Sequence, residues 1–135
     1  MPEPRPSIKI FTLDEANALL PQVKERLRAL RNLRADIVAQ QARVDVEEIT
    51  SFGRRTPAMD ALLGEISRAA EAFHQDMAAL HALGCELKDL DRGLVDFYAM
   101  RSNDVVYLCW MDGEEDIAWW HPLDSGVRGR RPLNS

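Results

Sequence analysis

The segment GCELKDLDRGLVDFYAM, residues 84–100, divides the chain into two kinds of structure, because the hydrophobic period of the chain changes within it. Before Gly84, apolar residues recur every three or four positions, as on one face of a helix. From Leu94 to Met100 they alternate with a period of two, as in a half-buried strand. Gly84 suits the left-handed conformation that ends many helices. The sequence therefore predicts helices before this segment and strands after it.

Two long helices are predicted before the segment. Thr12 and Glu15 have the spacing of a capping box, so the first helix begins at Thr12. Its apolar residues follow a period near that of a coiled coil, to about Glu48. Pro21 is expected to kink this helix or to begin its long part. Thr56, followed by a proline, has the character of an N-cap for the second helix. Two long helices with a short connector form an antiparallel hairpin.

Three strands are predicted after the hairpin, because the chain there is rich in β-branched and aromatic residues. They are Leu94–Met100, Val105–Trp110 and Ile117–His121. Arg101-Ser-Asn-Asp104 is expected to form the first turn and Asp112-Gly113 the second. A sheet this small needs a packing partner, so one face should cover the helices. The fold class is therefore α+β, a long antiparallel helical hairpin packed on a three-stranded antiparallel β-meander.

The expected organisation is a single domain preceded by a flexible lead. The parts are a flexible N-terminal lead at 1–10 and a single domain at 11–135, divided into the helical hairpin at 11–83, the β-meander at 84–123 and a basic Gly/Arg tail at 124–135. The exposed apolar stripe along so long a hairpin predicts that the protein self-associates as a homodimer.

Charge is unevenly distributed along the chain. The net charge of −5 combines +2 over residues 1–55, −10 over residues 56–127 and +3 over residues 128–135. So acidic a middle region argues against a nucleic-acid partner and suits a cation, a metal or a basic partner, or serves solubility alone. No apolar run is long enough to span a membrane. Cys85 and Cys109 are too few for a disulfide scaffold, which predicts a cytoplasmic protein with reduced thiols.

Three side chains of the meander are candidate metal ligands: Asp96, Glu114 and His121. An imidazole and two carboxylates suit a divalent transition metal, and the same groups suit proton transfer. The alternative is a strand-end histidine bonded to a backbone carbonyl, with carboxylates that are solvated or cap turns. Cys109, on the central strand, is a core side chain or the partner of His121 in a Cys-His pair.

Aromatic and basic residues near the C-terminus are candidate ligand-binding groups. Trp119 and Trp120 should point to opposite faces of the sheet, so one of them is open to a ligand or caps the hairpin. Trp110 or Trp120 is expected to form a wall of the site. Arg130, in a glycine-rich basic segment, can clamp an anion or lie in a solvated tail. The expected ligand is a small polar or anionic molecule.

Several motifs also carry a family resemblance. They are FTLDEANALLP at 11–21, Gly84 with LKDL at 87–90, GLVDF at 93–97, LCW at 108–110 with Gly113 and Glu114, and His121 with Gly126, Gly129 and Arg130. With these motifs, about residues 10–133 resemble a family of small bacterial proteins catalogued as a domain of unknown function, number twenty-two-oh-three. The resemblance implies no activity. It implies that Asp96, Trp110, Glu114, His121 and Arg130 belong to the family pattern. Tyr98 stands where the family is expected to have a proline.

Three functional hypotheses follow. The first is a binding module whose metal or small-molecule site lies on the meander. The second is a metal-assisted hydrolase, in which His121 and the carboxylates hold the ion and Arg130 binds an anionic substrate. The third is an interaction protein that acts through the helical hairpin. The residues leave open whether the protein is an enzyme.

Overall fold

The computed structural model describes residues 8–134, which fall into two compact units. One unit is Arg26–Ala79, and the other combines Met1–Glu25 with Leu80–Ser135. Most of the predicted N-terminal lead, residues 1–7, lies outside the described residues.

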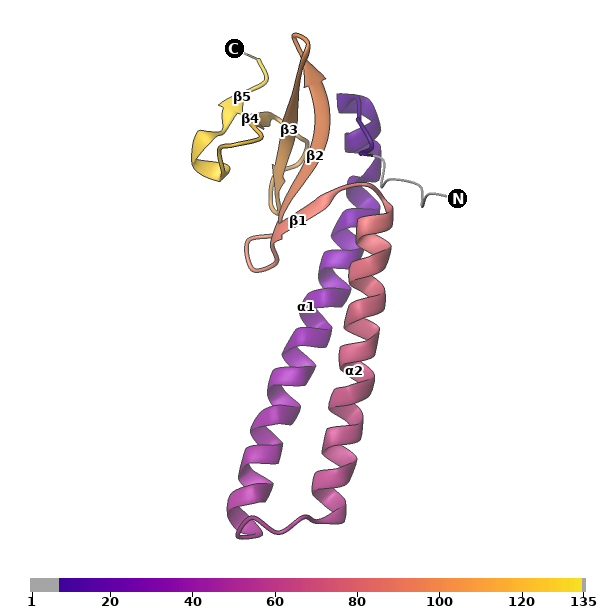
Figure 1. Cartoon of the computed structure of the whole chain (residues 1–135), viewed down its shortest axis with the longest axis vertical. Coiled ribbons are helices and arrows are strands. Elements are labelled where there is room, and N and C mark those ends of the chain that lie inside the picture. The colour runs from indigo at the N-terminus through magenta and orange to yellow at the C-terminus, as the bar shows by residue number, and fades with distance from the viewer. Residues whose placement is uncertain (1–7, 135) are drawn as a thin grey trace, which may run out of the picture. The chain divides into compact units, whose positions relative to one another are not determined.

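The observed elements confirm the α+β class and the helical hairpin, but the sheet has five strands rather than the predicted three. In chain order they are α1 (Leu13–Thr50), α2 (Pro57–Ala82), β1 (Glu86–Asp89), β2 (Leu94–Arg101), β3 (Asp104–Met111), β4 (Trp119–Pro122), the 3-10 turn η1 (Val127–Gly129) and β5 (Arg131–Pro132) (Figure 1). Neither helix has an apolar stretch long enough to cross a membrane.

Both predicted helix caps are confirmed. The amide of Thr12 donates to Glu15 Oε1 (2.9 Å), and the amide of Glu15 donates to Thr12 Oγ1 (3.1 Å). The amide of Met59 donates to Thr56 Oγ1 (3.1 Å) at the start of α2. These bonds satisfy amides that have no partner within the helix. Pro21 lies inside α1, which continues through it as one helix.

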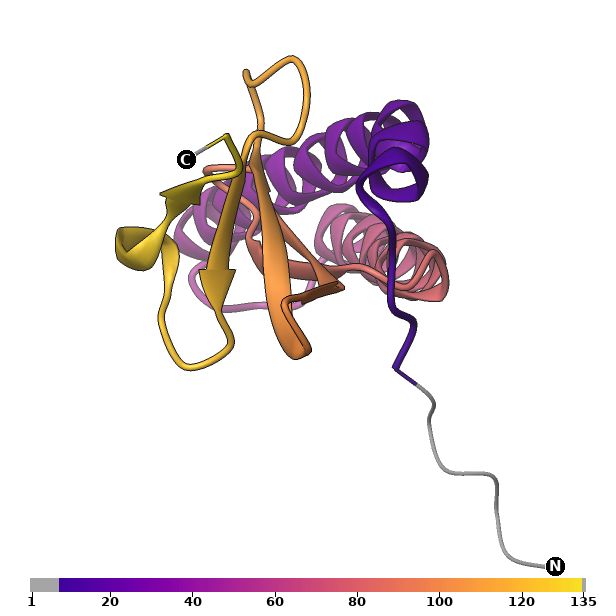
Figure 2. The same cartoon turned by 90° about the horizontal axis from the view of Figure 1, so that it is seen from above.

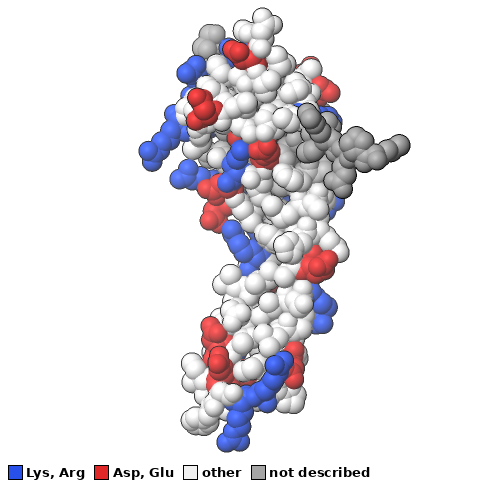
Figure 3. Space-filling model, viewed as in Figure 1, with Lys and Arg blue, Asp and Glu red and all other residues white. Residues whose placement is uncertain are grey.

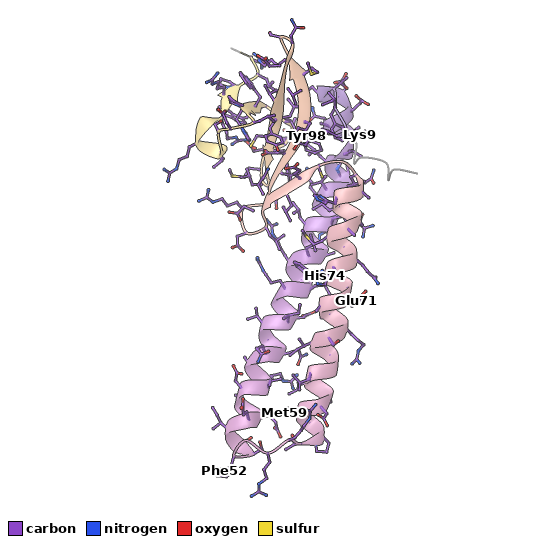
Figure 4. The ribbon with its side chains drawn as sticks, viewed as in Figure 1. Lys9, Phe52, Met59, Glu71, His74 and Tyr98 are labelled. Carbon is purple, nitrogen blue, oxygen red and sulfur yellow. The ribbon has the colours of Figure 1, made fainter. Side chains whose placement is uncertain are left out.

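The unit Arg26–Ala79 is an antiparallel pair of helical segments joined by a short connector (Figure 1). Arg26 Nη1 and Asp76 Oδ1 form an ion pair across the two helices (2.7 Å). At the other end Thr56 Oγ1 donates to Glu47 Oε1 (2.8 Å). Phe52, labelled in Figure 4, lies in the connector with a positive φ of 55° and is 89% exposed.

The five strands form an antiparallel meander in the order β1-β2-β3-β4-β5. Figure 2 shows β2 and β3 side by side, with the yellow C-terminal segment at the outer end of the sheet. The predicted turn between β2 and β3 is confirmed: Ser102 (φ 50°) and Asn103 (φ 71°) occupy its two central positions. Positive φ at both positions matches the twist of the flanking strands.

The strands differ from the prediction at three places in the chain. Ile117 was expected to begin a strand, but its amide donates to Asn17 Oδ1 of α1 (2.9 Å), and β4 begins at Trp119. The segment of β1 was not among the three predicted strands, yet it pairs with β2. Within the expected tail, β5 is only two residues long and pairs with β4.

One face of the sheet packs against the start of α1. Val95, Phe97 and Ala99 alternate along β2 on this face, and all are buried. The Phe97 ring makes an edge contact with Phe11, with ring centroids 5.3 Å apart. Lys24 lies over the Trp110 ring. This apolar face leaves the opposite face of the sheet for the polar residues.

Candidate metal centre

The opposite face of the sheet brings together polar side chains from three neighbouring strands. Asp96 on β2 lies opposite Cys109 on β3, and Tyr107 on β3 lies opposite His121 on β4. Residues two apart on a strand share a face, so all four side chains lie on one side. The tertiary pairing of the strands therefore creates the cluster.

Asp96 and His121 form a buried pair at the centre of this face. His121 Nε2 lies 3.0 Å from Asp96 Oδ2, and both side chains are 3% exposed. The two residues are 25 positions apart in the chain. The structure thus brings together two of the three predicted metal ligands.

The second ring nitrogen of His121 fixes the protonation of the pair. Nδ1 lies 2.8 Å from the carbonyl oxygen of Pro122, which can only accept, so Nδ1 carries a proton. The bond between Nε2 and Asp96 Oδ2 then requires one further proton, held on either atom. In both arrangements the pair is neutral overall. A cation at Nε2 would have to replace that proton.

Cys109 completes a set of three ligand types. One ligand atom from each of Asp96, Cys109 and His121 lies within 4.8 Å of the others. Bonds of about 2.0–2.3 Å to one zinc ion place its ligands about 3–4 Å from each other. Small side-chain shifts would therefore let all three bind one ion. Within residues 8–134 this is the one group of this kind.

Burial dominates the electrostatics of the cluster. Burial raises the pKa of Asp96, although the charge of His121 and hydrogen bonding by Cys109 and His121 oppose the shift. Burial, together with the charge of Asp96, raises the pKa of the Cys109 thiol to about 12. The thiol is fully buried and in its protonated form, so it is a poor nucleophile in the metal-free protein.

Asp96 Oδ1 is the one group of the pair with an unmet hydrogen-bonding capacity. It is buried and, among the described residues, accepts no hydrogen bond of good geometry, although the Cys109 thiol is close. An unsatisfied buried carboxylate oxygen destabilises the folded protein unless an ion, a water or a proton meets it. This oxygen is the structural sign that the cluster accommodates a further group.

A tyrosine pair continues the polar face from the cluster towards β1. Tyr107 stacks at a tilt near His121, with ring centroids 5.2 Å apart. Its hydroxyl donates to Glu86 Oε2 (3.1 Å), and the Tyr98 hydroxyl donates to Glu86 Oε1 (2.7 Å). Lys88 Nζ pairs with Glu86 Oε2 (2.7 Å). Tyr98 is labelled in Figure 4. Glu86 is therefore the acceptor that orders this side of the sheet.

Replacing Glu86 with glutamine is expected to change how stability depends on pH. Burial alone would raise the Glu86 pKa, but bonds from Lys88, Tyr98 and Tyr107 lower it below the usual 4.5. A lowered pKa stabilises the fold above about pH 4.5, and the contribution is lost as pH falls through the folded value. The wild type should therefore be the more stable at pH 7, and its advantage should shrink below pH 4.5.

Urea unfolding of both proteins between pH 3 and pH 7 measures this difference. Glu115→Gln is the matched control, since Glu115 is exposed and its side chain has no partner within residues 8–134. A constant difference between wild type and Glu86→Gln across the whole pH range would contradict the expected linkage.

The third predicted metal ligand, Glu114, lies in a different set of contacts. Its Oε1 accepts from Arg130 Nη2 (2.6 Å) and from the amide of Met111 (2.6 Å). Its carbonyl oxygen accepts from Trp110 Nε1 (2.9 Å). The group of candidate ligands contains Cys109 and not Glu114. Glu114 and Arg130 together fasten the loop after β3.

The candidate ligand-binding residues are also separated. Trp110 is fully buried beneath α1, and its indole N–H is occupied by Glu114. Arg130 stacks over Trp119 and donates to the carbonyl oxygen of Cys109 (3.3 Å), so it covers the polar face. Trp120 faces the other way and remains partly exposed. Trp120 lines an open hollow.

Sequence reasoning considered Cys109 as a core residue or a partner of His121, and did not include it among the metal ligands. The signal in the sequence was that Asp96 and Cys109 fall on adjacent strands. Whether their side chains point to the same face depends on the exact register of those strands. The roles of Glu86, Tyr98 and Tyr107 were missed because β1 was not recognised as a strand. Its short alternation of Glu86, Leu87 and Lys88 was the only sign.

The comparisons with known proteins give a family and no activity. No curated protein and no solved structure matches the chain. One family matches residues 9–133, and this range includes every residue of the cluster. The chain belongs to the family described as an uncharacterized conserved protein family, DUF2203.

Proposed function

We propose that the protein is a metal-binding module whose ion is held by Asp96, Cys109 and His121. The observation that carries the proposal is the convergence of nitrogen, sulfur and oxygen ligands from three strands within 4.8 Å of one another. The bond from His121 Nδ1 to the Pro122 carbonyl supports it, because ligating histidines commonly donate their second N–H in this way. Asp96 Oδ1, which is buried and accepts no hydrogen bond of good geometry within residues 8–134, supports it further.

The ligand types favour a divalent transition metal of borderline softness. Thiolate and imidazole select zinc and its neighbours over magnesium and calcium, which prefer oxygen ligands. Zinc is the best fit, since it accepts Cys, His and Asp together in a tetrahedral site. The two cysteines are free and buried, which supports a reducing, cytoplasmic setting in which Cys109 stays available.

The burial of the cluster favours a bound structural ion over a metal-assisted hydrolase. A catalytic zinc keeps an open coordination position that a substrate or water reaches. Here the side chains of Asp96 and His121 are 3% exposed, and Cys109 is fully buried. An ion at this place would join β2, β3 and β4 and stabilise the sheet.

Elemental analysis of the purified, untagged protein tests the proposal. Near-stoichiometric zinc or a related metal is expected in the wild type, with little in Cys109→Ser or His121→Ala. Glu114→Gln is the matched control, because Glu114 binds Arg130 instead, and it should retain the metal. Cobalt reconstitution adds a sulfur-to-cobalt charge-transfer band that Cys109→Ser should lack.

Two results would overturn the metal proposal. The first is a wild type free of metal even after incubation with divalent ions. The second is full metal content in Cys109→Ser together with loss in Glu114→Gln. That pattern would restore Glu114 as a ligand in place of Cys109.

We also propose that two copies associate through the helical unit, residues 26–79. Its two helices fully bury few apolar residues: Leu27, Leu30 and Val44 of α1 are buried, but no residue of α2 before Leu80 is. Val38, Val46 and Ile49 are each at least 60% exposed. A second copy would complete a four-helix bundle. The unit carries eight basic and eight acidic side chains, interspersed in Figure 3, so two copies do not repel each other through net charge.

Replacing Leu63 with aspartate is expected to convert a dimer into a monomer. Leu63 is 37% exposed on the apolar side of α2, so the charge would lie in the interface without being forced into the core of one chain. Light scattering after size exclusion measures the mass. Gln75→Asp, on the opposite side of the helix, should remain dimeric. A monomeric wild type at high concentration would contradict the proposal.

A further inference from the structure

The open hollow lined by Trp120 lies on the side of the sheet away from the metal-ligand cluster. It has a volume of about 570 Å³ and is formed by the turn between β2 and β3 together with the chain after β4. This volume is within the usual range of about 300–1,000 Å³ for small-molecule sites. Trp120 forms one of its walls, and a smaller hollow of about 320 Å³ shares that residue.

Two arginines stack on the same indole. The Arg101 guanidinium lies 4.7 Å from the ring of Trp120, and the Arg131 guanidinium lies 5.2 Å from it. Within residues 8–134 neither guanidinium forms an ion pair with a carboxylate, so both keep N–H donors for another acceptor. Stacking fixes each planar group in place, which reduces the entropy lost when it binds an anion.

The indole is positioned by its ring rather than by its N–H. Trp120 Nε1 is buried and has no hydrogen-bond partner among the described residues. A buried tryptophan nitrogen usually has a partner. Here the two guanidiniums lie over the ring, and Leu108 and Arg131 are the residues opposite Trp120 on the neighbouring strands. The arrangement therefore presents cations and an aromatic surface together.

The rest of the lining indicates the kind of anion. Val106 and Leu123 (47% exposed) provide apolar surface next to the arginines. Asp104 and Asp124 also line the hollow, and their charges disfavour a doubly charged phosphate more than a singly charged carboxylate. A guanidinium matches the two oxygens of a carboxylate in a bidentate bond.

We propose that this hollow, lined by Arg101, Trp120 and Arg131, binds an amphipathic monocarboxylate. The carboxylate is held by the two guanidiniums, and its aromatic or aliphatic body lies on Trp120, Val106 and Leu123. Because Trp119 and Trp120 point to opposite faces, this site is separate from the metal cluster and does not depend on it.

Calorimetric titration of the full chain with 2-naphthoate and with octanoate tests the site. Saturable binding is expected for both, with the amide of 2-naphthoate at least about tenfold weaker, because charged hydrogen bonds are lost. Arg101→Gln and Arg131→Gln should each weaken binding about tenfold or more. The indole N–H resonance of Trp120, assigned with Trp120→Phe, should shift on titration.

Arg128→Gln is the matched control, since Arg128 is an exposed arginine of the same basic segment and does not line the hollow. It should bind like the wild type, as should Cys109→Ser. An equal loss of carboxylate affinity in Arg128→Gln and Arg131→Gln would contradict the proposed site. So would equal binding of the neutral amide, tighter binding of inorganic phosphate than of the carboxylates, or no saturable binding at millimolar concentration.

Discussion

Phe97→Ala is expected to lower the free energy of unfolding by about 3–5 kcal/mol, the usual cost of removing a fully buried aromatic side chain. The Phe97 side chain is fully buried at the centre of β2. Its removal would leave a cavity beside Phe11 and abolish their edge contact, which has an interplanar angle of 87°. Since a domain is typically stable by about 5–15 kcal/mol, this loss is a large part of the total.

Urea unfolding followed by circular dichroism measures the loss, and Phe52→Ala is the matched control. The chemical change is identical, but Phe52 is 89% exposed in the connector, so its stability should change by less than about 0.5 kcal/mol. Similar losses in the two variants would contradict the assignment of Phe97 to the core.

Asp96→Ala is expected to have the second large effect. It should lower the free energy of unfolding by about 3–5 kcal/mol, because it removes one partner of a buried pair. His121 Nε2 would lose its bond at 3.0 Å and remain buried without a replacement. Asp96→Asn should lose less, since the amide can still donate to a neutral imidazole. The measurements are made after treatment with a chelator, so that metal binding does not contribute.

A double-mutant cycle with His121→Ala isolates the interaction between the two side chains. Once His121 is removed, the further loss from Asp96→Ala should be smaller. Asp116→Ala, at an exposed position, is the control and should change stability by less than about 0.5 kcal/mol. Wild-type stability in Asp96→Ala, or strict additivity in the cycle, would show that the pair is not coupled.

The helices and their caps could be predicted because their signals are local. Thr12 and Glu15 are three residues apart and bond to each other's amides, so their spacing in the sequence is sufficient. The turn at Ser102 and Asn103 was likewise predictable, because the residues that accept positive φ lie between two alternating segments. The short strands β1 and β5 were not, since their pairing depends on neighbours already in place.

The candidate site was predictable only in part. The chemistry of Asp96 and His121 was visible in the sequence, and their meeting required both to point to one face of a correctly ordered meander. Glu114 was equally acidic, but the loop after β3 turns it towards Arg130. The hollow at Trp120 brings together Arg101 and Arg131, which are far apart in the sequence, so no local pattern connects them.

The sequence alone was enough to establish the α+β class, the two helices with their caps, the order of strands β2, β3 and β4, and the residue types available for a site. These properties follow from periodicity and from bonds between residues within about four positions of each other. The tertiary structure was needed to show that Cys109 joins Asp96 and His121, and that Arg101 and Arg131 share the Trp120 ring. Strand register makes those choices, because a shift of one residue would turn each side chain to the other face.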